Sequence, residues 1–99
     1  MKRVRLASTA KRDLDAIFDY WAERASAEVA AELIYAVTDR FKLLAASPNI
    51  GRLSQDAGEG VRVFPAGKFL IYYRASSGTL HILHVVHGAR DQSKALRTE

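Results

Sequence analysis

The chain of 99 residues contains no cysteine. This absence excludes disulfide bonds, thiolate nucleophiles and zinc sites built on cysteine, and it suits a reducing compartment. No apolar run approaches the roughly 18 residues that span a bilayer, and no apolar segment follows the basic N-terminal residues as it would in a secretion signal. We therefore expect a cytoplasmic protein with no membrane partner.

The signatures of several enzyme classes are also missing. No serine is framed by glycines as in a nucleophile elbow, and Gly58-Glu59-Gly60 lacks the third glycine of a dinucleotide fingerprint. The three histidines do not predict a metal site, because strand alternation places His84 on the opposite face from His81 and His87, which lie about 20 Å apart at about 3.3 Å per residue. We expect no metal ion and no cofactor.

The size and charge of the chain indicate one small basic domain. A length of 99 residues suits a single domain over residues 1–99, and a core of this size gains appreciably from a bound partner. Residues 1–8, 9–46 and 47–99 carry formal charges of +3, −2 and +3. This distribution is compatible with nucleic acid, the ribosome or an acidic protein as partner, and charge alone does not choose among them.

Two helices are expected after a short N-terminal strand. Residues 2–7 alternate basic and apolar side chains, which is typical of a half-buried strand. Ser8 or Thr9 is expected to cap a first helix that ends near Arg24, and Ser26 a second that ends near residues 47–48. The short connection favours an antiparallel helix hairpin that covers one face of a sheet. Its apolar stripes are Ala10, Leu14, Ile17, Phe18 and Trp21, then Val29, Leu33, Val37, Phe41 and Leu44. The acids Asp13, Asp15, Asp19 and Glu23 are expected on the solvated face.

The last third of the chain predicts three short antiparallel strands after an irregular loop over residues 48–60. Alternation places Phe69, Ile71 and Tyr73 on one face of the sheet, and Leu70, Tyr72 and Arg74 on the other. One face can pack on the helix hairpin. The second face, also largely apolar, has only the tail after Arg90 to cover it, so we expect it to be open to a partner.

The order of short motifs resembles one known family. The motifs are Ala10, Asp13-Leu14 and Ile17 to Tyr20; Pro48-Asn49-Ile50-Gly51-Arg52; Val61-Arg62; Ile71-Tyr72-Tyr73-Arg74; and Val85-Val86-His87-Gly88-Ala89-Arg90-Asp91. Together they are similar to the RelE/ParE toxin superfamily, and most of all to its ParE branch. The resemblance covers residues 3 to about 92.

This resemblance implies an α+β domain with the order β-α-α-β-β-β, in which a helix hairpin packs on a mainly antiparallel sheet. It also implies the toxin half of a type II toxin-antitoxin system, neutralised by a cognate ParD-like antitoxin in a hetero-oligomer. ParE-type members, known from plasmid stabilisation, poison DNA gyrase, whereas RelE-type members cut messenger RNA on the ribosome.

The choice between the two activities depends on catalytic residues. Phe69 stands where a ribonuclease member tends to carry a strand arginine, and residues 92–99 hold neither the Tyr nor the His that such members use in this tail. We therefore expect a non-enzymatic gyrase inhibitor, with no catalytic residue. The alternatives are a RelE-like ribosome-dependent endoribonuclease and an inactive member kept as a subunit of a complex.

Candidate binding residues follow from the strands and from the closing motif. Guanidinium groups on rigid strands can address carboxylates, phosphates or carbonyls of a partner. The candidates for target binding are Arg62, Arg74, His87, Arg90 and Asp91. The candidates for antitoxin binding are Leu70, Tyr72 and Trp21.

Overall fold

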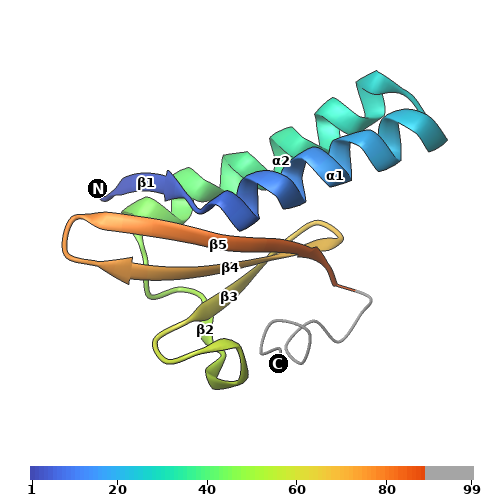
Figure 1. Cartoon of the computed structure of the whole chain (residues 1–99). Coiled ribbons are helices and arrows are strands. Elements are labelled where there is room, and N and C mark those ends of the chain that lie inside the picture. The colour runs from blue at the N-terminus through green and yellow to red at the C-terminus, as the bar shows by residue number, and fades with distance from the viewer. Residues whose placement is uncertain (89–99) are drawn as a thin grey trace.

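The structure, a computed structural model, describes residues 1–88 and consists of two layers, a helix hairpin and a sheet (Figure 1). The elements follow in the order β1 (Arg3–Leu6), α1 (Ser8–Arg24), α2 (Ala27–Ala46), β2 (Arg52–Leu53), the 3-10 helix η1 (Gln55–Ala57), β3 (Arg62–Ala66), β4 (Phe69–Ser76) and β5 (Thr79–His87). The predicted α+β class and element order are confirmed. The two-residue strand β2 is an addition within a segment that the sequence indicated only as a loop.

The sheet has the strand order β1-β5-β4-β3-β2. The last three strands form antiparallel hairpins, and β2 pairs antiparallel with β3. In contrast β1 runs parallel to β5, with Val4 opposite Leu80. Parallel neighbours need a long crossover connection between them. The chain between β1 and β5 provides it, because it includes the helix hairpin and the strands β2 to β4. The first strand is thus held at the sheet edge by the last.

The helix limits agree with the sequence, but only one of the two caps does. The Ser26 hydroxyl accepts a hydrogen bond from the Val29 amide at 3.0 Å and caps α2, as predicted. The predicted cap of α1 is wrong: Ala7 occupies the cap position, without a side-chain bond. Thr9 instead donates from its hydroxyl to the carbonyl oxygen of Leu83 in β5, at 2.6 Å. This side chain therefore ties the helix to the sheet.

The main core fills the space between the helices and the sheet. Its largest fully buried members come from both layers: Val37, Leu44, Ile71, Tyr73, Leu80 and Ile82. We call this side of the sheet the inner face and the opposite side the outer face. Phe18 and Val29 belong to the predicted helix stripes, yet they remain 36% and 37% exposed.

A β-bulge in the hairpin of β4 and β5 changes which side chains share a face. Tyr72 lies opposite His84 and Tyr73 opposite Ile82, so Leu83 is an extra residue on β5. His81 and His84 therefore pair with the outer-face residues Arg74 and Tyr72, whereas His87 pairs with Phe69 of the inner face. The expectation that His84 opposes the other two histidines is wrong, because simple alternation cannot foresee the bulge. Residues 1–88 contain no group of three side chains able to hold a metal ion.

A second, smaller cluster lies on the outer face. Val61, Val63 and Tyr72 are buried there, with Ala57, Leu70, Leu83 and Val86 packed against them. Tyr72 is only 3% exposed. The expectation that this apolar face is open is therefore wrong for Tyr72, because Ala57 and Val61, from the segment before β3, pack in the same cluster.

Neither helix of residues 1–88 is long and apolar enough to cross a membrane.

Candidate target-binding face

The hydroxyl of Tyr73 fixes the loop between α2 and β2. It donates a hydrogen bond to the Pro48 carbonyl at 2.8 Å and accepts one from the Gly51 amide at 2.9 Å. A Cβ atom added to Gly51 would overlap the Tyr73 ring and hydroxyl, so only glycine fits this close approach. The Pro-x-x-Gly pattern of residues 48–51 is thus explained by one buried tyrosine on β4.

Arg62 holds the same loop from β3. Its guanidinium donates to the carbonyl oxygen of Gly51 at 2.7 Å and to that of Asn49 at 3.3 Å. Burial raises the pKa of the Tyr73 hydroxyl, and the Gly51 amide and the nearby Arg62 charge oppose part of that rise. The target-binding candidate Arg62 is therefore engaged within the chain, where it braces residues 49–51.

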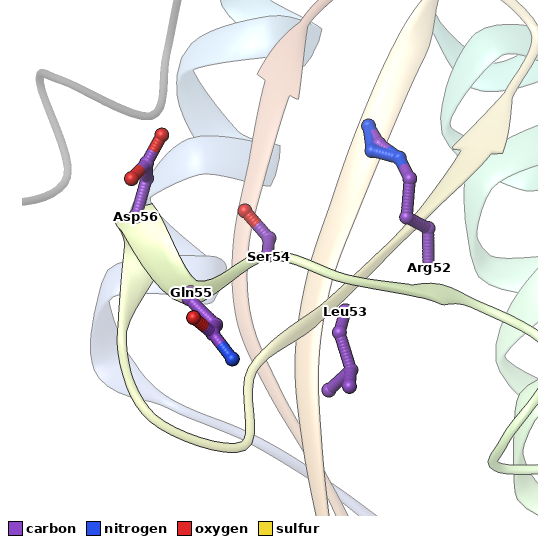
Figure 2. A pocket seen from close by; sticks show the side chains of 5 residues that line it. All are labelled: Arg52, Leu53, Ser54, Gln55 and Asp56. Carbon is purple, nitrogen blue, oxygen red and sulfur yellow. The ribbon is translucent and has the colours of Figure 1, made fainter.

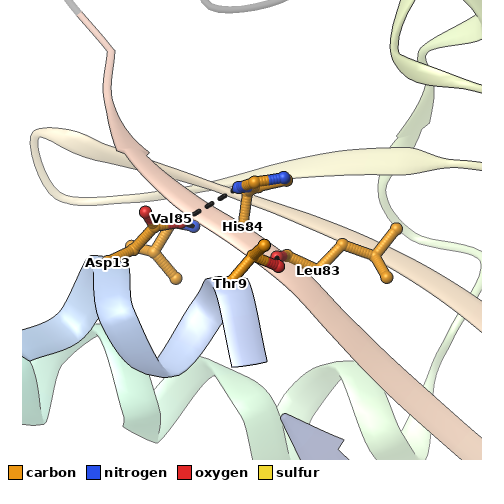
Figure 3. Close-up of polar contacts among 5 residues, drawn as sticks. All are labelled: Thr9, Asp13, Leu83, His84 and Val85. Carbon is orange, nitrogen blue, oxygen red and sulfur yellow. Dashed lines mark hydrogen bonds and ion pairs between the residues drawn. The ribbon is translucent and has the colours of Figure 1, made fainter. Parts of the chain in front are cut away.

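Side chains of α1 take the place of a strand beside β5 (Figure 3). The register of β1 with β5 ends at Leu6 and Ile82, so the following part of β5 needs other partners for its backbone. The Asp13 carboxylate accepts a hydrogen bond from the Val85 amide at 2.9 Å, close to the Thr9 bond to Leu83. The prediction of a solvated Asp13 is wrong, because this carboxylate completes the sheet edge.

The same Asp13 oxygen lies 3.1 Å from Nδ1 of His84. Both side chains are about 30% exposed, at 28% for Asp13 and 30% for His84. A carboxylate on Nδ1 orients an imidazole and leaves Nε2 to accept a proton from another group. One feature of the sequence pointed to a special role for Asp13, namely its place in the Asp13-Leu14 motif. The helix pattern alone could not tell Asp13, which contacts β5, from the exposed Asp15.

The three target-binding candidates within residues 1–88 do not form one patch. Arg62 pairs with the inner-face residue Tyr73, while Arg74 pairs with His81 on the outer face. Arg74 is exposed, and a Cβ atom built on Gly58 would lie 3.7 Å from its guanidinium. His87 is exposed at the far end of β5, edge-on to Phe69 at 5.7 Å. Arg90 and Asp91 lie outside the described residues.

The antitoxin-binding candidates are also separated. Trp21 packs half-buried against the inner core, and the Lys68 ammonium lies over its ring at 4.4 Å. Leu70 is half-buried on the outer face, and Tyr72 beside it is buried. Phe69 is 3% exposed on the inner face. An arginine at position 69 would be buried beneath the helices and would not reach a substrate. The presence of Phe69 is therefore no argument by itself against a ribonuclease.

A hollow of about 420 Å³ is formed by one loop (Figure 2). Its lining consists of the consecutive residues Arg52, Leu53, Ser54, Gln55 and Asp56. Among the described residues, this lining offers one cation, Arg52, and one carboxylate, Asp56.

The same architecture occurs in chains of two solved toxin-antitoxin structures. A structure of the chromosomal ParDE system from P. aeruginosa aligns with a TM-score of 0.76 and 24% identity over 88% of this chain and 96% of that chain. The RelBE2 toxin-antitoxin complex from Mycobacterium tuberculosis aligns with a TM-score of 0.65 and 25% identity over 87% and 96%.

Sequence comparison then identifies the branch. Residues 4–92 match the family described as ParE toxin of type II toxin-antitoxin system, parDE, and the chain belongs to this family. It is 30% identical to Toxin ParE1 of Caulobacter vibrioides, over 88% of this chain and 90% of the relative. It is 27% identical to Toxin ParE1 of M. tuberculosis, over 95% and 97%.

Proposed function

We propose that the protein is a non-enzymatic toxin that inhibits DNA gyrase in the cytoplasm and is neutralised by a ParD-like antitoxin. The observation that carries the proposal is the match to the ParE family over residues 4–92. The ParDE and RelBE2 structures are toxin-antitoxin systems, which supports an antitoxin partner and a hetero-oligomer.

The described surface also supports binding rather than catalysis. The Arg62 guanidinium bonds to loop carbonyls, and the Tyr73 hydroxyl is buried against the same loop, so neither is presented to a substrate. The outer face presents the half-buried side chains Leu70, Leu83 and Val86, which lie around the buried Tyr72, and it also carries exposed arginines. Such a surface suits a protein target, with the apolar part supplying affinity and the charges supplying steering.

A RelE-like ribonuclease is the second candidate, and one pair of residues favours it. His84 is oriented by Asp13 on the outer side of β5, which is the arrangement of a general base. The Val85 amide bonds to the same Asp13 oxygen, so the pair also has a structural reason to exist. The variant His84→Gln separates the two roles, because Gln can still hydrogen-bond to Asp13 but cannot act as a base at neutral pH.

The deciding experiment compares two assays on the same purified toxin. Supercoiling by DNA gyrase and translation in a cell-free extract are measured side by side, with toxin alone and with toxin held by its antitoxin. We expect inhibited supercoiling and intact messenger RNA, unchanged in His84→Gln. Cleaved message that disappears in His84→Gln would establish the ribonuclease instead. An effect in neither assay would identify an inactive subunit.

A further inference from the structure

Basic side chains form a row across three strands of the outer face. The register places Arg5 of β1 opposite His81 of β5, and His81 opposite Arg74 of β4. Arg3 lies two residues before Arg5 on the same side of β1, next to Thr79. We call Arg3, Arg5, His81 and Arg74 the basic row. Because neighbouring strands are about 4.8 Å apart, the three opposed positions span about 10 Å on a rigid surface.

The arginines of the basic row have no partner within residues 1–88. Arg3, Arg5 and Arg74 are exposed, and none of them makes a side-chain hydrogen bond or ion pair in this part of the chain. Some cations elsewhere are engaged: Arg62 bonds to loop carbonyls, and the Arg24 guanidinium lies 4.1 Å from the centre of the Tyr20 ring.

Within residues 1–88, no carboxylate forms an ion pair with the basic row. The flanking positions Thr79 and Ser76 are uncharged, and Ser76 bonds to His81 at 3.1 Å and accepts from the Lys2 ammonium at 2.9 Å. Like charges on neighbouring strands disfavour folding unless a partner supplies negative charge. The positive charge of the row is therefore uncompensated within the described residues.

We propose that the basic row binds the phosphate backbone of duplex DNA. Guanidinium groups pair with phosphates in a planar, two-bond geometry, and duplex DNA carries one negative charge per about 1.7 Å of its axis. The row contains no Phe, Tyr or Trp on which unpaired bases could stack, which favours a duplex over a single strand. This inference deepens the proposed function, since gyrase acts on duplex DNA, but the binding itself requires no gyrase.

The expected interaction is weak and strongly dependent on salt. Contacts to phosphates alone give dissociation constants of about 10⁻⁴ to 10⁻⁶ M at physiological salt. Each phosphate neutralised contributes about −0.9 to the slope of log K against log salt concentration, so the three arginines together contribute about −2.7.

Fluorescence anisotropy with a labelled 20-base-pair duplex tests the proposal between 50 and 200 mM salt. The variant Arg3→Gln/Arg5→Gln/Arg74→Gln should bind about tenfold more weakly or worse, with a slope less negative by about 2.7 units. The matched control Lys11→Gln/Arg12→Gln/Lys42→Gln removes the same charge from exposed positions of the helices and should bind nearly as wild type.

Equal loss in both variants, or loss in neither, would overturn the proposal, because binding would then follow net charge or another surface. Thermal melting establishes that each variant is folded. Should the triple variant fail to fold, Arg5→Gln and Arg74→Gln are measured singly, each with an expected change of about 0.9 in slope.

The nature of the polymer is tested by competition. Unlabelled duplex DNA should displace the probe better than single-stranded DNA, duplex RNA or polyglutamate at equal charge. Stronger displacement by any of the other three would overturn the assignment to duplex DNA. The supercoiling assay separates the two proposals: DNA binding without gyrase inhibition keeps this inference and rejects the proposed function, and gyrase inhibition without DNA binding does the reverse.

Discussion

The hydroxyl of Tyr73 accepts a hydrogen bond from the amide of Gly51, which precedes it by 22 residues. It connects the centre of β4 to the loop that follows α2, and through Arg62 to β3. Two motifs of the chain, around residues 48–52 and 71–74, are therefore halves of one buried contact. Together they fix the conformation of the loop between α2 and β2.

Removing the hydroxyl should destabilise the protein. Tyr73→Phe leaves the Gly51 amide and the Pro48 carbonyl without their partner, and an unpaired buried polar group costs about 1–3 kcal/mol. We expect a melting temperature lower by about 4–8 °C per kcal/mol, measured by circular dichroism. Tyr35→Phe is the control, because Tyr35 is 69% exposed and should tolerate the change. Equal effects of the two changes would contradict a special role of Tyr73.

The same residue predicts a loss of stability in alkali. The pKa of Tyr73 is raised above its usual value of 10.0 by burial, so the folded state holds this proton more firmly than the unfolded state. The resulting stability is fully present below about pH 10 and is lost as the pH rises through the higher folded pKa. Urea unfolding at pH 8 to 11 should show a steeper decline for wild type than for Tyr73→Phe. Parallel declines would show that other groups dominate.

Gly51→Ala should destabilise the protein, and its cost should be coupled to that of Tyr73→Phe. Gly51→Ala brings a Cβ atom into the Tyr73 ring and should cost about 1–3 kcal/mol through overpacking. The double variant with Tyr73→Phe should cost less than the sum of the two single changes, because both disturb one contact. Denaturant titration of the four proteins gives the coupling directly. Additive costs would mean that the loop moves away from Tyr73 freely.

Asp13 should contribute to stability, whereas Asp15 should not. Asp13→Ala removes the acceptor of the Val85 amide at a sheet edge, and the loss of a partly exposed bond to a charged group costs about 1–2 kcal/mol. Asp15→Ala, exposed on the same helix, should stay within about 0.5 kcal/mol. Hydrogen exchange provides the local readout: faster exchange at Val85 in Asp13→Ala alone is expected, and unchanged exchange would contradict the pairing.

Antitoxin binding should be strong and mainly apolar. Interfaces of about 1,600 Å² support nanomolar affinity, and burial of apolar surface gives a negative heat-capacity change. Isothermal titration calorimetry at several temperatures measures both quantities. Trp21→Ala and Leu70→Ser should weaken binding, with Ile50→Ser, also a large apolar residue and 46% exposed, as control. A heat-capacity change near zero, or affinity lost in modest salt, would identify an electrostatic contact instead.

The features that could be predicted from the sequence are those that depend on residues close together in the chain. The Ser26 cap and the helix limits follow from residues near one another in the chain, and the alternation of β4 from Phe69 to Arg74 follows from the strand period. The roles of Thr9 and Asp13 depend on β5, more than 70 residues later, so no local pattern reveals them. The bulge at Leu83 is a property of the pair of strands rather than of either one, and it puts His84 on the same face as His81 instead of the opposite one.

The parallel pairing of β1 with β5 also determines when the toxin becomes complete during its own synthesis. β1 pairs with Thr79 to Ile82 of β5. The first strand to be synthesised therefore cannot pair until the last strand has left the ribosome. A nascent chain that stops before residue 79 has no partner for β1 and no basic row. The sheet edge formed by β1 is therefore among the last parts of the fold that synthesis can complete.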